Sequence, residues 1–143
     1  MTELEIYIDG ASKGNPGHSG IGVVICREGN AVKNISRYIG QATNNIAEYT
    51  ALIFALQEAL IMRADSVKIN TDSQLLYRQI NRTYKVKHPN IIGLFTQALQ
   101  LMSGFTKVSI RHIPREENLV ADKLATQAVN KEVKKAKQTD VLL

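Results

Sequence analysis

A change in the spacing of apolar residues near position 43 constrains the fold of this chain more than any other feature. Residues 3–9 alternate apolar and polar side chains with period two, which is typical of a half-buried strand, and residues 21–27 and 31–39 are further strand candidates. From residue 43 onward the spacing is helical, with apolar side chains at Ile46, Tyr49, Leu52, Ile53, Leu56 and Leu60. The first part of the chain therefore predicts a β-meander, and the remainder predicts helices that alternate with strands.

The order of the later elements predicts an α/β fold. We expect a strand, two helices, a strand and a last helix, in that order, at 66–71, 73–81, 90–102, 107–113 and 116–137. Residues 10–20 are rich in Gly, Asn, Pro and Ser, and this composition predicts a turn. The full order, βββαβααβα, favours a mixed sheet with helices packed on its faces. A helical crossover would make the first and fourth strands parallel neighbours.

Length and charge narrow the classes of protein further. The chain has 143 residues without a repeat or a dividing linker, so we expect a single domain over 1–143 with a basic C-terminal tail at 131–143. Lys and Arg outnumber Asp and Glu by 18 to 13, and the net charge of +5 favours a polyanionic partner. The one cysteine excludes an intrachain disulfide and a Cys-rich zinc site.

No targeting or membrane segment is expected. The start of the chain, MTELEIYID, lacks the basic residues and apolar stretch of a signal peptide. The most apolar region, 51–62, is too short to cross a bilayer and is interrupted by Gln57 and Glu58. We therefore expect a cytoplasmic protein with no membrane partner, and we expect it to be a monomer.

Four carboxylates stand out by their positions in these elements. Asp9 closes the first strand and Asp72 closes the fourth, so two adjacent parallel strands would place them side by side. Glu48 falls in the first turn of the long helix, and Asp122 falls within the first two turns of the last one. Clustered acids repel one another unless cations neutralise them, and carboxylate oxygens suit Mg²⁺ or Mn²⁺. The alternative is that each acid serves only a turn or a helix dipole.

Four segments that contain these acids resemble type 1 ribonuclease H. They are YIDGASKGNPG at 7–17, TNNIAEYTAL at 43–52, INTDSQ at 69–74 and PREENLVADKLA at 114–125. They occur in the order found in the family and cover nearly the whole domain. The resemblance implies the ribonuclease H fold, which has a five-stranded mixed sheet with flanking helices.

The resemblance also implies a reaction and a metal site. The family hydrolyses the RNA strand of RNA/DNA hybrids with two Mg²⁺ or Mn²⁺ ions, which leaves 5′-phosphate and 3′-hydroxyl ends. The matching catalytic and metal-binding residues are Asp9, Glu48, Asp72 and Asp122. Asp9 would bridge both ions, with Glu48 and Asp72 on one ion and Asp122 on the other.

Five polar residues match substrate contacts of the family. Asn15, Asn44, Asn45 and Gln74 match positions that contact the minor groove of the hybrid, and Thr43 matches a DNA-phosphate contact. Amide side chains both donate and accept hydrogen bonds, which suits the 2′-hydroxyl group that distinguishes RNA from DNA. Asn15 and Asn44 could also serve turn and cap geometry, and both roles can hold together.

The chain departs from the family pattern in three places. It has no tryptophan, and its short basic segment 78–88 resembles the compact form that lacks the basic protrusion. His112 has a plausible spacing to Asp122 for a residue that assists product release, but we favour Arg115 as the residue near the scissile phosphate. The lysines of the tail could contact phosphates, although we favour a role in complementing the helix dipole.

Two other functions remain open at this point. The first is a non-catalytic module that binds RNA/DNA hybrids, although a pure binder would not need four carboxylates near a phosphate backbone. The second is a relaxed nuclease that also cleaves double-stranded RNA. An ATP-using enzyme is disfavoured because the Gly-rich segment 10–20 lacks the GK[ST] ending of a phosphate-binding loop.

Overall fold

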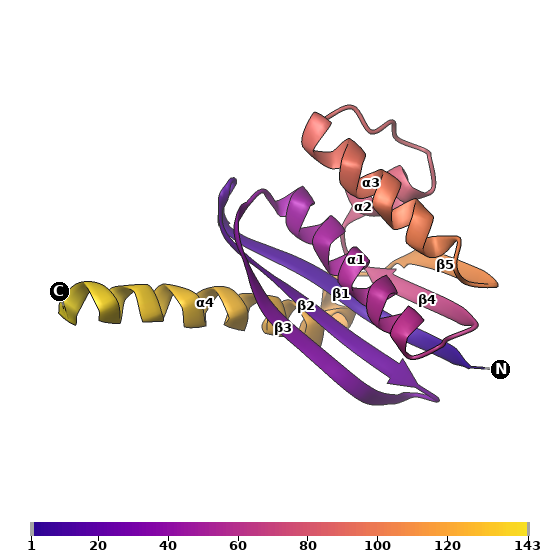
Figure 1. The fold of residues 1–143 in the computed structure, drawn as a ribbon, viewed down its shortest axis with the longest axis horizontal. Helices are drawn as coiled ribbons and strands as arrows, with labels where there is room; N and C mark the ends of the chain where they lie inside the picture. Colours follow the sequence, from indigo (N-terminus) through magenta and orange to yellow (C-terminus); the bar gives the residue numbers. More distant parts are fainter. Residues whose placement is uncertain (1, 143) are drawn as a thin grey trace.

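A five-stranded mixed sheet forms the centre of the molecule (Figure 1). The computed structural model describes residues 2–142, with side chains from 2 to 138. The strands lie in the order β3-β2-β1-β4-β5 and span Glu3–Gly14 (β1), Gly17–Arg27 (β2), Asn30–Ala42 (β3), Ser66–Thr71 (β4) and Lys107–His112 (β5). The first three strands pair antiparallel, whereas β4 runs parallel to both β1 and β5. The predicted mixed sheet, with the first and fourth strands as parallel neighbours, is confirmed.

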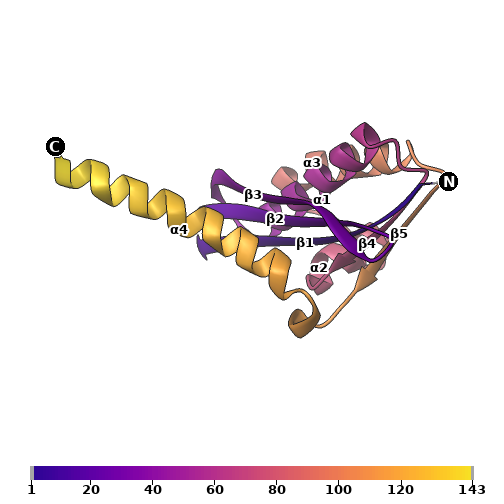
Figure 2. The same ribbon diagram turned by 90° about the horizontal axis from the view of Figure 1, so that it is seen from below.

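Helices cover both faces of this sheet (Figure 2). They are α1 (Asn44–Ile61), α2 (Gln74–Ile80), α3 (Pro89–Met102), a short 3₁₀ helix η1 (Arg115–Glu117) and α4 (Leu119–Leu142). The first helix lies on one face with α2 and α3 packed against it, and α4 crosses the opposite face. Within the described residues, no helix is both long and apolar enough to cross a membrane.

The core between α1 and the sheet explains why these segments fold as they do. Alternate residues of β1 and β2 point toward α1, as the period-two pattern predicts. The largest fully buried side chains of this core include Leu4, Ile6, Ile8, Ile21, Ile25, Tyr49, Leu52 and Leu56. Each such side chain contributes roughly 1.5–3 kcal/mol relative to an exposed one. Helix α1 begins at Asn44 because Thr43 caps its N-terminus: the Thr43 hydroxyl accepts a hydrogen bond from the Ile46 N–H at 3.2 Å.

The predicted turn at 10–20 is wrong. β1 continues to Gly14 and β2 begins at Gly17, so this segment is a long hairpin whose tip is Asn15–Pro16. Asp9 therefore lies inside β1 and does not close it. What ends beside Asp9 is the parallel ladder with β4, whose last pair is Ile8 with Thr71. Asp9 and Asp72 each follow one member of this pair, so they lie side by side as predicted. The prediction assumed that Asp9 ends its strand, whereas only the parallel pairing with β4 ends there.

Two helix positions also differ from the prediction. Glu48 lies in the second turn of α1, because Thr43 is the cap and Asn44 is the first helical residue. The last helix does not begin at residue 116. Residues Arg115–Glu117 form η1, Asn118 separates the two helices, and α4 begins at Leu119. This break places Asp122 in the first turn of α4.

Candidate metal and nucleic-acid site

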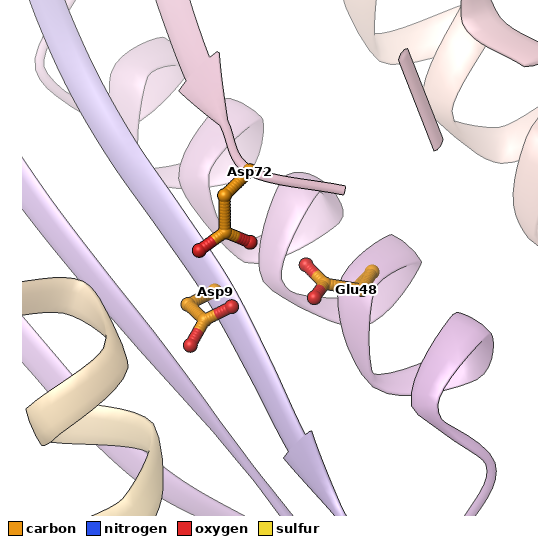
Figure 3. Close-up of side chains that lie close together, drawn as sticks. All are labelled: Asp9, Glu48 and Asp72. Carbon is orange, nitrogen blue, oxygen red and sulfur yellow. The ribbon is translucent and has the colours of Figure 1, made fainter. Parts of the chain in front are cut away.

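Three carboxylates meet where the parallel part of the sheet ends (Figure 3). Asp9 comes from β1, Glu48 from α1 and Asp72 from the residue after β4, and one oxygen of each lies within 4.8 Å of the other two. Opposite ligands of one Mg²⁺ are about 4 Å apart, since each lies about 2.1 Å from the ion. The three side chains are therefore close to the spacing at which they could share one divalent cation.

Gly10 allows α1 to bring Glu48 to this place. A Cβ atom on Gly10 would lie 2.5 Å from the carbonyl carbon of Ala47 and 2.6 Å from the nitrogen of Glu48. No side chain fits in this gap, so the backbones of β1 and α1 touch directly. The close contact at Gly10, next to Asp9, thus determines how near the Glu48 side chain comes to Asp9.

Burial and mutual repulsion raise the pKa values of two of these carboxyl groups. The pKa of Asp9 is raised to about 10, first by burial and then by repulsion from Glu48 and Asp72. A side-chain hydrogen bond with Asp122 contributes to this rise. The pKa of Glu48 is raised to about 8, first by burial and then by repulsion from Asp72, while hydrogen bonds with Asp9 and Gly10 oppose the rise. The cluster therefore holds more negative charge than its buried position favours.

The donor set fits a divalent cation. Asp9 is only 5% exposed and Glu48 only 8% exposed. Among the described side chains, Glu48 Oε2 is one of three buried polar atoms that have no hydrogen-bond partner. A buried carboxylate oxygen without a partner is costly in a protein interior, and a hard cation such as Mg²⁺ would satisfy it.

Asp122 lies in the same cleft but outside this closest group. The cleft has a volume of about 480 Å³. Its lining residues are Asp9, Gly10, Ala11, Ser12, Lys13, Asn44, Glu48, Asp72, Arg115, Asp122, Thr126 and Val129. Asp122 Oδ1 is 3.9 Å from Arg115 Nη2, and the Arg115 side chain is 77% exposed at the mouth of the cleft. The four predicted carboxylates and the predicted arginine thus share one cleft.

Asn118 fastens the start of α4 to β1. Its side-chain Nδ2 donates a hydrogen bond to the Ile8 carbonyl oxygen at 2.8 Å, and the residue is 1% exposed. Its own carbonyl oxygen accepts a hydrogen bond from the Asp122 N–H at 3.1 Å. One side chain therefore links the residue before Asp9 to the turn that carries Asp122. Sequence reasoning did not single out Asn118, and its only signal was an Asn just before a helix.

Two glycines of β2 let α4 approach the sheet. A Cβ atom on Gly22 would lie 2.0 Å from the carbonyl oxygen of Ala121, and one on Gly20 would lie 2.7 Å from that of Ala125. Alternating glycines within a strand mark a close backbone approach of this kind. Sequence reasoning assigned Gly20 to a turn, so it missed this role.

The predicted amide residues lie beside the cleft at the start of α1. Asn15 at the hairpin tip accepts a hydrogen bond from the Asn44 N–H at 3.0 Å through its Oδ1 atom. This hydrogen bond joins the hairpin tip to the first residue of α1, and the side chain that caps the helix is Thr43. Asn44 is exposed and lines the cleft, and Asn45 has a buried Oδ1 atom without a partner. These side chains retain groups that can contact a ligand.

The remaining candidates, Gln74 and His112, lie in α2 and at the end of β5. Gln74 is the first residue of α2 and is exposed, while the Ser73 hydroxyl caps that helix. His112 packs its ring 5.8 Å from the ring of Tyr77 and is not among the residues that line the cleft. Of these two candidates for the auxiliary residue, Arg115 lines the cleft and His112 does not.

Comparisons with known proteins agree with this architecture. A family model described as "Reverse transcriptase-like" matches residues 7–128. Ribonuclease HI of Halobacterium salinarum is 40% identical over 128 residues, which cover 89% of this chain and 64% of that protein. A bifunctional protein of Mycobacterium tuberculosis is 37% identical over 130 residues, which cover 90% of this chain and 36% of that protein. The chain thus spans between about a third and two thirds of the length of these relatives.

A solved structure shows the same fold. The crystal structure of LC11-RNase H1 in complex with an RNA/DNA hybrid has a TM-score of 0.85 and is 42% identical, covering 91% of this chain and 99% of that chain. A mixed sheet of this strand order, with acids beside the ends of its parallel strands, defines the ribonuclease H-like class. The chain belongs to the ribonuclease H family, and the relatives that it resembles are of type 1.

Proposed function

We propose that the chain is a metal-dependent endoribonuclease that hydrolyses the RNA strand of RNA/DNA hybrids. The observation that carries this proposal is the buried cluster of Asp9, Glu48 and Asp72, in which one Glu48 oxygen has no partner. A module that only binds nucleic acid would be weakened by such a cluster, because unneutralised carboxylates repel the phosphates that the site must accept. Family membership and the hybrid bound by LC11-RNase H1 support the choice of substrate.

The four carboxylates would hold two Mg²⁺ or Mn²⁺ ions. Asp9 would take part in both ion sites, because it is clustered with Glu48 and Asp72 and also interacts with Asp122. Glu48 and Asp72 would complete one ion site, and Asp122 the other. Bound divalent ions supply a hydroxide nucleophile near neutral pH and stabilise negative charge on the leaving oxygen.

The proposed reaction is an in-line displacement at phosphorus. A water molecule gives up a proton to solvent and its oxygen forms the new bond to phosphorus, the bond from phosphorus to the 3′ oxygen breaks, and the leaving oxygen takes up a proton from solvent. The products carry a 5′-phosphate and a 3′-hydroxyl. Arg115 would bind the reacting phosphate, since its exposed guanidinium lines the cleft beside Asp122.

The polar residues at the start of α1 would recognise the hybrid. Asn44 and Asn45, with Gln74 across the cluster, would donate to and accept from 2′-hydroxyls and base edges in the minor groove. Thr43 would contact a DNA phosphate while it caps α1. Asn15 would act both on the hybrid and on the Asn44 backbone, because its Oδ1 atom is engaged and its amide N–H₂ group is still available to donate.

Isosteric variants of the acids test this proposal. Asp9→Asn and Asp72→Asn keep the shape of the site and remove the charge that would hold the cations. We expect both variants to lose cleavage of a labelled RNA/DNA hybrid in Mg²⁺ and to retain hybrid binding, as measured by fluorescence anisotropy. Glu28→Gln, in the exposed turn between β2 and β3, is the matched control and should cleave at the wild-type rate. Cleavage that persists in either aspartate variant would contradict the site assignment.

A further inference from the structure

Two cationic side chains line the cleft, Lys13 and Arg115. Arg115 lies beside Asp122 and has a place in the proposed reaction. Lys13 lies on β1, the strand that carries Asp9, and the proposed reaction gives it no role. The geometry of β1 and α4 indicates what Lys13 can bind.

β1 places Lys13 and Asp9 on the same face of the sheet. Side chains two and four residues apart in a strand point the same way, so Asp9, Ala11 and Lys13 form a row, and all three line the cleft. At about 3.3 Å per residue, Lys13 lies about 13 Å from Asp9 along the strand. β4 pairs with β1 only as far as Ile8, so β4 does not extend beside this row.

α4 runs beside this row in the same direction (Figure 2). Gly22, the ladder partner of Asp9, packs against the start of α4. Gly20 is two residues nearer the hairpin tip, and it packs against residues 125–129, which lie one to two turns further along the helix. The cleft is therefore a trough between β1 and α4, with the carboxylates at one end and Lys13 at the other.

The Lys13 ammonium group is free to bind a ligand in this trough. The side chain is exposed, and among the described side chains it makes no hydrogen bond and no ion pair. The lining residues between Asp9 and Lys13 are Gly10, Ala11 and Ser12, whose small side chains leave room for an extended ligand. A lysine ammonium is a compact charge on a flexible stem, and it binds phosphates as a point charge.

We propose that Lys13 binds a backbone phosphate of the cleaved strand, within about four nucleotides of the scissile phosphate. The number follows from the separation of about 13 Å from Asp9, since one strand of a duplex advances about 3.4 Å per nucleotide along its axis. This inference rests on the proposed function, because it takes the occupant of the cleft to be the RNA strand of a hybrid. The contact adds affinity without sequence specificity, because a lysine contact to a phosphate carries no base information.

The salt dependence of hybrid binding tests this contact. Fluorescence anisotropy in EDTA would measure the dissociation constant of a labelled RNA/DNA hybrid at several salt concentrations, for the wild type, Lys13→Gln, Lys13→Arg and Lys123→Gln. Lys123 is the matched control, because it follows Asp122 in α4 and is exposed but does not line the cleft. Loss of one phosphate contact lowers the slope of the logarithm of affinity against the logarithm of salt concentration by about 1.

The variants should therefore separate a direct contact from an effect of net charge. We expect the slope to fall by about 1 in Lys13→Gln, to keep the wild-type value in Lys13→Arg, and to change by less than about half as much in Lys123→Gln. Equal slopes in Lys13→Gln and Lys123→Gln would overturn the proposal. A Lys13→Arg variant that shares the loss would overturn it too, since arginine keeps the charge.

Steady-state cleavage in Mg²⁺ provides a second criterion. A contact away from the reacting atoms binds substrate and transition state equally, so its loss raises KM and leaves kcat unchanged. We expect Lys13→Gln to raise KM by about 3–10-fold with kcat within about twofold of the wild type, and Lys123→Gln to change neither by more than about twofold. A fall in kcat without a rise in KM would contradict the proposal, because Lys13 would then act in the reaction itself.

The two proposals fail separately. A wild-type protein that cleaves no hybrid, but loses the slope of one contact in Lys13→Gln, overturns the nuclease alone. A protein that cleaves the hybrid with the same KM and the same salt slope in Lys13→Gln as in the wild type overturns the Lys13 contact alone.

Discussion

Asp9 and Gly22 are direct partners across the antiparallel ladder of β1 and β2, and the space above Gly22 is filled by the carbonyl oxygen of Ala121. The missing side chain at Gly22 therefore determines how closely α4 approaches the strand that carries Asp9. Asp122 is the next residue after Ala121, so the same contact sets the position of the fourth carboxylate. Gly10 has the corresponding role for α1 and Glu48.

Gly22→Ala should damage both the fold and the site. Its new Cβ atom would lie 2.0 Å from the Ala121 carbonyl oxygen, so α4 must move away from the sheet. We expect the free energy of unfolding to fall by about 1–3 kcal/mol, as for other overpacked sites, and cleavage to fall with it. Thermal unfolding and hybrid cleavage check the two effects.

Gly93→Ala is the matched control for Gly22→Ala. Gly93 lies in α3, and a Cβ atom there would meet nothing within 4 Å. Because alanine favours helix over glycine, this variant should gain about 0.5–1 kcal/mol of stability and cleave normally. A Gly22→Ala protein as stable as Gly93→Ala would show that the close approach of α4 has no energetic role.

Asn118→Ala should move Asp122 without unfolding the protein. The change removes the donor to the buried Ile8 carbonyl oxygen and should cost about 1–3 kcal/mol. Because the start of α4 loses its tether to β1, we also expect the Mg²⁺ concentration at half-maximal cleavage to rise. Asn130→Ala on the exposed side of the same helix should change neither quantity. A variant that loses stability but keeps the wild-type Mg²⁺ dependence would contradict the positioning role.

The metal-free protein should lose stability as pH rises. The pKa values of Asp9 and Glu48 are raised in the folded state, to about 10 and about 8, so the folded protein binds more protons than the unfolded chain above about pH 4. The free energy of unfolding therefore falls with rising pH through this window, and the loss is complete only above the folded pKa values. Urea unfolding in EDTA between pH 5 and 9 measures this slope, and added Mg²⁺ should reduce it.

Asp9→Asn distinguishes the cluster from other sources of that slope. The uncharged amide removes the repulsion, so the variant should be more stable than the wild type in EDTA at about pH 8, by about 0.5–2 kcal/mol. Glu116→Gln, at an exposed position in η1, should leave the slope as it is. A metal-free wild type that gains stability from pH 6 to pH 9 would contradict the account.

Arg115 and His112 should differ in their effects on the reaction rate. Arg115 lines the cleft and is 77% exposed, so Arg115→Ala should leave stability unchanged and lower the single-turnover rate by about 10²-fold. His112→Ala removes a ring that packs against Tyr77 outside the cleft, so its rate should stay within a few-fold of the wild type. The opposite ranking of the two variants would assign the auxiliary role to His112.

The sequence predicts much of this fold because local periodicity and packing agree. The alternation at residues 3–9 and the helical spacing after Thr43 both appear in the core beneath α1. The hairpin was mistaken for a turn because its glycines serve tertiary contacts. Gly10 and Gly20 make room for helices that come from distant parts of the chain, and no local pattern reveals those helices.

The candidate site divides in the same way. Asp9 and Asp72 could be placed together from the sequence, because each follows an apolar segment that forms part of the parallel ladder between β1 and β4, whose last pair is Ile8 with Thr71. Asn118 could not, since its partner Ile8 is 110 residues away and neither residue carries reactive chemistry.

Cleavage of a labelled RNA/DNA hybrid by the wild-type protein tests the central claim most directly. The hybrid would be incubated with Mg²⁺, with Mn²⁺ and with EDTA, beside RNA and DNA duplexes of the same sequence. The account predicts metal-dependent cutting of the RNA strand of the hybrid, with 5′-phosphate and 3′-hydroxyl ends. Additional cutting of the RNA duplex would identify a relaxed nuclease. Binding of the hybrid without cutting in either metal would contradict the account and favour a binding module.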